Sequence, residues 1–367
     1  MMNLTRIQFK TTFDLKNRIN YLFIFNLHRT TQFDKMKGFH TVFFLLIAIF
    51  FFSCNEPADS PYPNIQFEKK TSLPGTGRAS AVAFVIDGRG YVALGRTAQR
   101  SGALNDCWQY NPDSDSWKQK ASFPGIARVK AMAVVLNHKA YIGLGFNISE
   151  GVYNFDACLK DFWMYDPAID TWTKMADFPS NYTDACASFV INNTIYQTSG
   201  MNGASFGEQV WKFIPQTGQP GTWLRLKDFP GTARAGGIAS ATDSRCFFGT
   251  GYMTDNLNDW WEYFPSNDTW KKRKSMPDNG RENSVSLEIN NRILITTGRH
   301  FGGNLTGGHV DSDILEYDVV RNVWYERGNI PNSGRENAIA FTINGKGYIG
   351  YGENDTQVLN DFYSFEP

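Results

Sequence analysis

Arginine is the residue type in this chain whose spacing suggests chemistry. Counting back 17 positions from the glycine that ends each of six apolar segments reaches an arginine in five of the six cases. A guanidinium group binds carboxylate or phosphate through paired hydrogen bonds, so several of them around one opening would form an anion site. Alternatively, each arginine pairs with a carboxylate or carbonyl of a neighbouring repeat and only stabilises the fold. The arginines are Arg78, Arg128, Arg234, Arg281 and Arg335.

Two of these arginines are followed by a glutamate. Segments 280–283 and 334–337 both read Gly-Arg-Glu-Asn. At the opening of a channel, Glu282 and Glu336 could act as a general acid or base. They could equally neutralise the arginines and order the loop, and the sequence favours this second interpretation. The chain contains no Gly-x-Ser-x-Gly or His-Glu-x-x-His motif, so it carries no strong catalytic signature.

A second group of candidates directly follows the glycine of each apolar segment. These residues begin the loops between the second and third strands expected in each repeat, on the same side of the fold as the starts of the first strands. Those loops vary most in length, and function in such folds usually resides in variable loops. Aromatic rings stack on sugar faces, and charged groups bind hydroxyls or carboxylates. Four of these residues would suit a sugar or an acidic ligand: Arg96, Tyr252, Arg299 and Glu353.

The elements that must position these residues form a repeat of about 50 residues. Each repeat has two short apolar segments joined by a two-residue turn, such as Asp87-Gly88 or Asn344-Gly345, which is a strong hairpin signal. Two aromatic segments follow, usually Asp-x-Trp-x-Tyr and then Trp. Four strands repeated six times predict an all-β, six-bladed β-propeller. The sixth tryptophan is missing, and Phe67 has its spacing, so the N-terminal strand should close the last blade.

This pattern resembles the Kelch repeat over residues 64–367, although the usual Gly-Gly doublet is reduced to a single glycine. The architecture is also similar, more distantly, to the bacterial Kelch-type N-acetylneuraminate epimerases (mutarotases), which are exported six-bladed propellers. That resemblance implies acid–base residues and arginine at the channel mouth. Arg281, Glu282, Arg335 and Glu336 are the places to look for them. The long inserted loops and the catalytic residues of that family are not matched one by one.

The N-terminal region has the features of an export signal. Residues 36–53 contain Met36-Lys37 and an uninterrupted apolar run over 42–52, which is too short to span a membrane as a helix. Cys54 follows directly and resembles the cysteine of a bacterial lipobox, which implies cleavage before Cys54 and its lipidation. Residues 54–63 then form a tether, and residues 1–35 are an over-extended start. An uncleaved anchor or an ordinary signal is the alternative.

Histidine and cysteine offer weaker signals. His300 and His309 lie near Asp311 in a variable loop, and two histidines with an acid could bind a metal. No further ligands accompany them in the sequence, so no metal and no cofactor are expected. Four cysteines follow the presumed anchor, and the sequence leaves open whether they pair or are free thiols, with Cys107–Cys158 the conceivable bridge. They are Cys107, Cys158, Cys186 and Cys246.

The formal net charge of +0 argues against a nucleic-acid partner. The leading expectation is a lipid-anchored propeller of the bacterial cell envelope, tethered to a membrane, with the outer membrane favoured. Its channel-mouth face would bind a glycan-related anion, another acidic small molecule or a protein partner without catalysis. A sugar mutarotase or epimerase is the first alternative, and a pure protein-interaction scaffold is the second.

Overall fold

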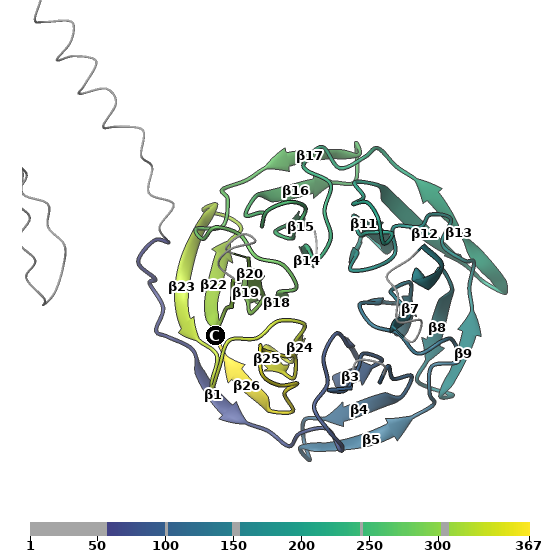
Figure 1. Ribbon diagram of the computed structural model, residues 1–367, viewed down its shortest axis with the longest axis horizontal. Coiled ribbons are helices and arrows are strands. Elements are labelled where there is room, and N and C mark those ends of the chain that lie inside the picture. Colours follow the sequence, from purple (N-terminus) through teal and green to yellow (C-terminus); the bar gives the residue numbers. More distant parts are fainter. Residues whose placement is uncertain (1–56, 100–101, 149–154, 243–244, 302–307) are drawn as a thin grey trace, which may run out of the picture. The chain divides into compact units, whose positions relative to one another are not determined.

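The computed structural model describes residues 57–99, 102–148, 155–242, 245–301 and 308–367. They form six antiparallel sheets of four strands, arranged as blades around a central axis (Figure 1). The predicted six-bladed propeller is therefore confirmed. Within this part of the chain, no helix has the length and apolar character needed to cross a membrane. The expected export signal and Cys54 lie outside the described residues.

The first three blades each follow the chain from the axis outward. Blade 1 consists of β2 (Val82–Ile86), β3 (Arg89–Ala93), β4 (Cys107–Asn111) and β5 (Ser116–Lys120). Blade 2 consists of β6 (Met132–Leu136), β7 (Lys139–Gly143), β8 (Phe162–Asp166) and β9 (Thr171–Lys174). Blade 3 consists of β10 (Ala187–Ile191), β11 (Thr194–Thr198), β12 (Val210–Gln216) and β13 (Gln219–Arg225).

The other three blades contain one insertion and the ring closure. Blade 4 consists of β14 (Ile238–Ala241), β15 (Cys246–Gly249), β16 (Trp260–Phe264) and β17 (Thr269–Lys272). Blade 5 consists of β18 (Val285–Ile289), β19 (Arg292–Thr296), β22 (Asp313–Asp318) and β23 (Val323–Asn329), with β20 (Arg299–His300) and β21 (His309–Val310) inserted as a small hairpin. Blade 6 consists of β24 (Ile339–Ile343), β25 (Lys346–Gly350), β26 (Phe362–Glu366) and β1 (Gln66–Lys69).

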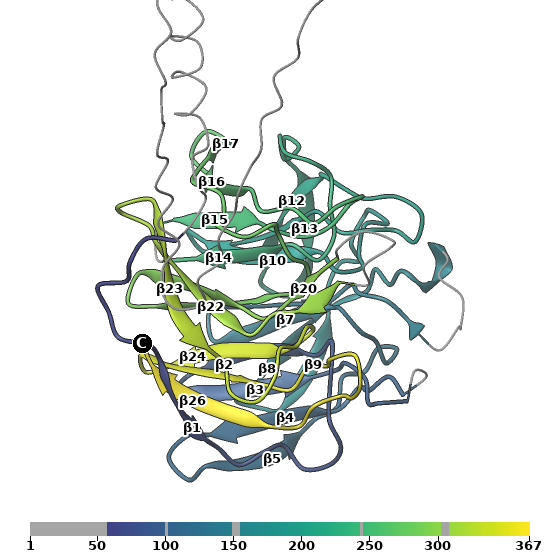
Figure 2. The same cartoon turned by 60° about the vertical axis from the view of Figure 1, so that its left-hand side comes forward.

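The N-terminal strand β1 completes blade 6. It pairs antiparallel with β26, and Phe67 lies opposite Phe365, as Figure 2 allows the reader to follow. The ring therefore closes by joining the two ends of the propeller, as the missing sixth tryptophan predicted. This pairing covers the outer edge of β26 and ties the first strand to the last.

The turns between the first two strands of the blades use residues that tolerate left-handed backbone. Asp87 and Gly88 have φ of 49° and 71°, and Asn290 and Asn291 have φ of 55° and 61°. Two successive positive φ values match the right-handed twist of a tight hairpin. The innermost strands, which precede these turns, have alternate residues buried, for example in β2 and β6. The local sequence therefore determines both the turn and the face of the strand that is buried.

Backbone hydrogen bonds join neighbouring blades near the axis. The glycine that ends each apolar segment donates its N–H to the carbonyl at the arginine position of the next blade, over 2.7–2.9 Å. Gly352 donates to Arg78 in this way and so links blade 6 to blade 1. The six donors have positive φ between 84° and 107°, which glycine adopts at little cost. The fixed spacing of glycine and arginine is thus a property of the interface between blades.

The aromatic residues of the repeat pack and lock the outer strands. In blade 2, Tyr165 donates its hydroxyl to Asp170 in the following turn at 2.6 Å. Trp172 donates its Nε1–H to the Ala121 carbonyl of blade 1 at 2.9 Å. Equivalent tryptophan bonds to the preceding blade are made by Trp117, Trp223 and Trp324. These residues serve the fold, as their recurrence predicted.

The chain preceding β1 is docked along blade 5. Ala58 donates its N–H to the Trp324 carbonyl at 2.8 Å, and Ile65 donates to Arg327 at 3.0 Å. The Tyr62 ring lies 4.7 Å from the Arg292 guanidinium and 5.1 Å from that of Arg327, distances typical of cation–π contacts. The described part of the expected tether is therefore held against the propeller.

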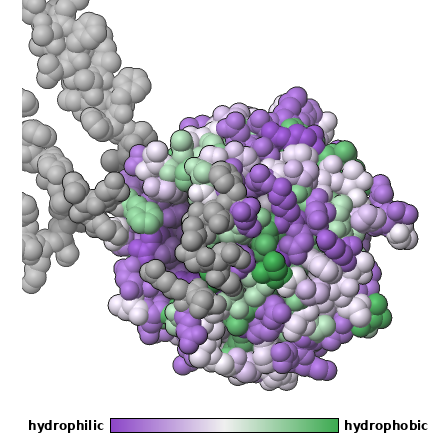
Figure 3. Space-filling model, turned by 45° about the vertical axis from the view of Figure 1, so that its right-hand side comes forward, coloured by the Kyte–Doolittle hydropathy of each residue, from purple (hydrophilic) through white to green (hydrophobic). Residues whose placement is uncertain are grey.

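The four described cysteines are free thiols, and Cys107, Cys158 and Cys246 are buried. The conceivable Cys107–Cys158 bridge is not formed. On the face seen in Figure 3, hydrophobic residues occur in small patches between hydrophilic ones.

Candidate functional site

The five repeated arginines lie inside their blades. Each is between 0% and 4% exposed and pairs with the aspartate that precedes or begins the third strand of its own blade. Arg128, for example, contacts the two carboxylate oxygens of Asp161 at 2.7 and 2.8 Å and donates to the Leu144 carbonyl at 3.0 Å. The pairs are Arg78–Asp106, Arg128–Asp161, Arg234–Asp259, Arg281–Asp313 and Arg335–Asp361.

This geometry favours the stabilising role over the anion site. Both ends of the guanidinium fork are used by a carboxylate, and a backbone carbonyl takes a further N–H. The partner also differs from the one expected, because each aspartate belongs to the same blade and not to a neighbour. Arginine therefore links the inner and outer strands of one blade, and its own carbonyl links that blade to the previous one. We assign these five residues no part in the candidate site.

Blade 3 lacks both members of the pair. Thr183 occupies the arginine position and is fully buried, and Gln209 occupies the aspartate position. The buried Gln197 of the same blade donates its side-chain N–H to the Ser199 carbonyl at 2.9 Å. Because arginine and aspartate are replaced together, no buried charge is left without a partner.

The Arg–Asp pairs predict loss of stability in acid. Burial opposes ionisation of these aspartates, but hydrogen bonds and charge from arginine hold the pKa of four of them below the usual value: Asp106, Asp161, Asp259 and Asp361. Their stabilisation is complete above the pKa of an unfolded aspartate and disappears as pH falls through the lowered folded pKa. We expect the free energy of unfolding to fall steeply below about pH 4. Urea denaturation between pH 6 and pH 2.5 measures this, and a flat profile would contradict it.

A pocket of about 330 Å³, here called the mouth pocket, opens at the starts of the first strands. Five of the six blades supply its lining, so it lies on the propeller axis. The residues that follow the arginines and the blade glycines meet there through isolated β-bridges, for example between Glu282 and Arg299 and between Glu336 and Glu353. The predicted candidates that line it are Arg96, Glu282, Arg299, Glu336 and Glu353.

Two arginine–glutamate pairs frame the mouth pocket. Arg299 contacts Glu336 at 2.5 Å, and Arg96 forms an ion pair with Glu353. Each glutamate also accepts a hydrogen bond from an asparagine amide: Asn283 donates to Glu336 at 2.9 Å and Asn337 donates to Glu353 at 3.0 Å. These contacts fix four of the charged side chains, so Glu336 is held as a structural partner of Arg299.

Glu282 differs from the other two glutamates of the mouth pocket. Within the described residues its carboxylate makes no hydrogen bond or ion pair. The pKa of Glu282 is raised to about 7, chiefly by burial; Glu336 and Asp184 add to the rise, and Lys130 and Arg299 oppose it. A carboxyl group that titrates near neutral pH can both accept and return a proton. This makes Glu282 the strongest acid–base candidate among the described residues.

The backbone conformation of neighbouring blades leaves space beside the Glu282 carboxylate. The second residue after each arginine position has φ between 50° and 64°, in the left-handed region, and hydrogen bonds of 2.9–3.1 Å connect most of these residues around the axis. In blade 4 the residue is Gly236. A Cβ there would lie 3.2 Å from a carboxylate oxygen of Glu282, so glycine leaves space beside the acid. The ring contains Ser80, Lys130, Ala185, Gly236, Asn283 and Asn337.

The remaining candidates lie at the edge of the site. Tyr252 does not line the mouth pocket, but its ring centroid is 5.6 Å from that of Phe301, which does. His309 lies 3.1 Å from Asp311, and His300 contacts the Gly280 carbonyl at 3.0 Å. The described residues contain no group of three or more side chains arranged to hold a metal ion.

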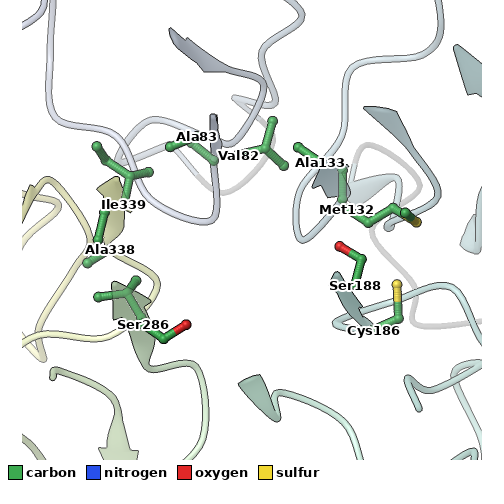
Figure 4. A pocket seen from close by; sticks show the side chains of 13 residues that line it. Val82, Ala83, Met132, Ala133, Cys186, Ser188, Ser286, Ala338 and Ile339 are labelled. Carbon is green, nitrogen blue, oxygen red and sulfur yellow. The ribbon is translucent and has the colours of Figure 1, made fainter. Parts of the chain in front are cut away.

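Two cavities lined mostly by small uncharged residues continue along the axis beneath the mouth pocket. A cavity of about 140 Å³ shares Ser80, Lys130, Asn283 and Asn337 with it. A further cavity of about 210 Å³ lies between the first strands. Figure 4 shows its small lining side chains, among them Ala133, Cys186, Ser188 and Ser286. The charged groups of the axis are therefore concentrated at the mouth.

Some residues of the site were not identified from the sequence. Lys130 and Asp184 line the mouth pocket, and so do the bracing amides of Asn283 and Asn337. They stand one or two positions after the arginine position of their blades. The same phase that identified Glu282 and Glu336 could have identified them, because neighbouring repeats place equivalent positions around one axis.

The fold and its mouth pocket define a six-bladed β-propeller with a polar site on its axis. Over 206 residues the chain is 25% identical to the N-acetylneuraminate epimerases of Haemophilus influenzae strains PittEE and 86-028NP. The match covers 47% of this chain and 51% of each relative, so the chain matches these curated relatives over about half of their length. No known family profile matches the chain.

A solved structure has the same fold. The structure of YjhT aligns with a TM-score of 0.67 at 17% identity, covering 81% of this chain and 100% of that one. The protein is a Kelch-like propeller, distantly related to the N-acetylneuraminate epimerases.

Proposed function

We propose that the mouth pocket binds a sugar and catalyses exchange at its anomeric centre, as a carbohydrate mutarotase or epimerase. The observation that carries this proposal is Glu282: a carboxyl group that has no direct partner among the described residues and a pKa of about 7, beside fixed arginine–glutamate pairs. The distant relationship to proteins named N-acetylneuraminate epimerase adds support. It also makes an acidic sugar the first ligand to test.

The chemistry needs only proton transfer. Opening a sugar ring removes the proton of the anomeric hydroxyl and delivers a proton to the ring oxygen, and closing on the other face reverses both steps. In this proposal ionised Glu282 accepts the hydroxyl proton while the bond between the anomeric carbon and the ring oxygen breaks, and water supplies the proton that the ring oxygen gains. On closure the bond reforms, the ring oxygen gives its proton back to water, and Glu282 returns its proton to the hydroxyl. Arg96 and Arg299 are preorganised by their glutamates and would orient hydroxyl or carboxylate groups. Phe301, which is 40% exposed, offers a ring for the sugar face.

Proton NMR of anomeric exchange tests the proposal directly. The purified protein is added to freshly dissolved N-acetylneuraminate and to a small panel of neutral and acidic sugars. We expect saturable acceleration for an acidic sugar, and no acceleration by protein that has been unfolded by heat. If no sugar in the panel exchanges faster or shows line broadening, the enzymatic proposal fails. Binding of a protein partner then becomes the better hypothesis.

We also propose that Cys54 carries a lipid and anchors the propeller in the bacterial cell envelope. The sequence pattern of residues 36–54 supports this proposal. Expression in a bacterial host with a radiolabelled fatty acid should label the wild-type protein and place it in the membrane fraction. Cys54→Ser should abolish both label and membrane association. Equal labelling of the two proteins would contradict lipidation at this residue.

A further inference from the structure

Among the described residues, Lys130 is the cation of the mouth pocket that has no ion pair with a carboxylate. It comes from blade 2, at a left-handed position with φ of 52°, and lines both the mouth pocket and the cavity directly beneath it. Arg96 and Arg299 are each paired with a glutamate. Within the described part of the chain, the Lys130 ammonium group has no such ion pair and no hydrogen bond.

Lys130 lines the mouth pocket together with four carboxylates. Four carboxylates act on it, and they come from blades 3, 5 and 6, whereas Lys130 belongs to blade 2. Two of the four are already neutralised by arginine. The four are Asp184, Glu282, Glu336 and Glu353. Of the four, Glu282 is the one whose carboxylate has no hydrogen bond or ion pair among the described residues.

The charged groups that act on the Glu282 carboxyl also belong to the mouth pocket. Lys130 and Arg299 favour its ionised form, while Glu336 and Asp184 oppose it. Arg299 is compensated twice, by Glu336 at 2.5 Å and by Asp355 at 2.7 Å. Lys130 is thus the one facing cation whose charge is not already balanced by ion pairs among the described residues.

We propose that Lys130 is a positioning residue of the acid–base site: its ammonium group, and not Arg96 or Arg299, keeps the half-buried Glu282 carboxyl available in the ionised form that accepts a proton. The role of Lys130 in catalysis rests on the proposed function. The electrostatic link between the two side chains does not. Lys130 would act on a substrate through Glu282.

The test follows the titration of Glu282 by carbon-13 NMR of the labelled carboxyl group, assigned by its loss in Glu282→Gln. We expect Lys130→Met to move the titration midpoint upward by about one pH unit, because an opposite charge has been removed. Lys130→Arg keeps the charge and should leave the midpoint close to wild type. Methionine and arginine meet the same left-handed backbone requirement as lysine, so the pair separates charge from folding.

Each outcome decides the inference. An unchanged midpoint in Lys130→Met, or an equal shift in both variants, overturns it. If the midpoint shifts in the methionine variant alone, the inference stands even when neither protein accelerates anomeric exchange, and then only the proposed function fails. Where exchange is present, its pH–rate profile should move upward in Lys130→Met by the same amount as the NMR midpoint.

Discussion

Replacing Glu282 with glutamine is expected to slow anomeric exchange by about 100- to 10,000-fold, the usual contribution of a positioned acid–base group. Glutamine keeps the size and hydrogen-bonding capacity of the side chain but cannot accept the proton of the anomeric hydroxyl. Since the Glu282 carboxylate has no direct partner within the described residues, no ion pair is broken by the change. Stability should therefore change little, and the loss should fall on kcat more than on KM.

The pH dependence gives this prediction a second readout. Burial raises the pKa of Glu282 to about 7, and the proposed base is the ionised form. The wild-type rate should therefore rise as pH increases through about 7. In Glu282→Gln this rise should be absent. Glu208, an exposed glutamate of blade 3, provides the matched control, and Glu208→Gln should behave as wild type. Full exchange activity in Glu282→Gln would remove this residue from the mechanism.

Glu336 is the natural comparison for Glu282 within the mouth pocket. It follows Arg335 exactly as Glu282 follows Arg281 in the sequence, yet it is held by Arg299 and by the Asn283 amide. The two glutamates were indistinguishable candidates on sequence alone. Their difference depends on which neighbouring blade supplies an arginine in the loop, and this appears only once the ring is assembled.

The fold was predictable because the repeat encodes it several times over. Turn residues with positive φ, the glycine that donates to the next blade, and the tryptophan that donates to the previous one all recur with one spacing. The position of β1 was predictable for the same reason, since Phe67 has the spacing of the absent tryptophan. Loops without a repeated spacing carry no such redundancy.

The side chains at the site were only partly predictable. Repeat phase placed Arg96, Arg299 and Glu353 at one end of the propeller, and they do meet in one pocket. Phase does not give the direction of a side chain, so the buried arginines were candidates too. One available signal pointed to their true partners. The aspartate that precedes or begins the third strand is absent in the same blade that lacks the arginine, where Thr183 and Gln209 replace the pair.

That natural replacement yields the second large prediction. Arg128→Thr should lower the free energy of unfolding by about 3 kcal/mol, because Asp161 keeps its charge in a largely buried site without the guanidinium that compensates it. Adding Asp161→Gln should restore part of the loss, since the double variant reproduces the uncharged pair of blade 3. Urea denaturation of the two variants measures both changes, and the mouth pocket should retain its ligand affinity in each.

An exposed ion pair provides the control for the Arg128 and Asp161 variants. Arg321 pairs with Asp318 at 2.7 Å, but its side chain is 65% exposed, and exposed pairs contribute about 1 kcal/mol or less. Arg321→Thr should therefore have a small effect. Two results would contradict the assignment of the repeated arginines to folding. One is a double variant at least as unstable as the sum of its single changes. The other is an Arg128→Thr protein with wild-type stability and lost ligand binding, which would return the arginines to the binding site.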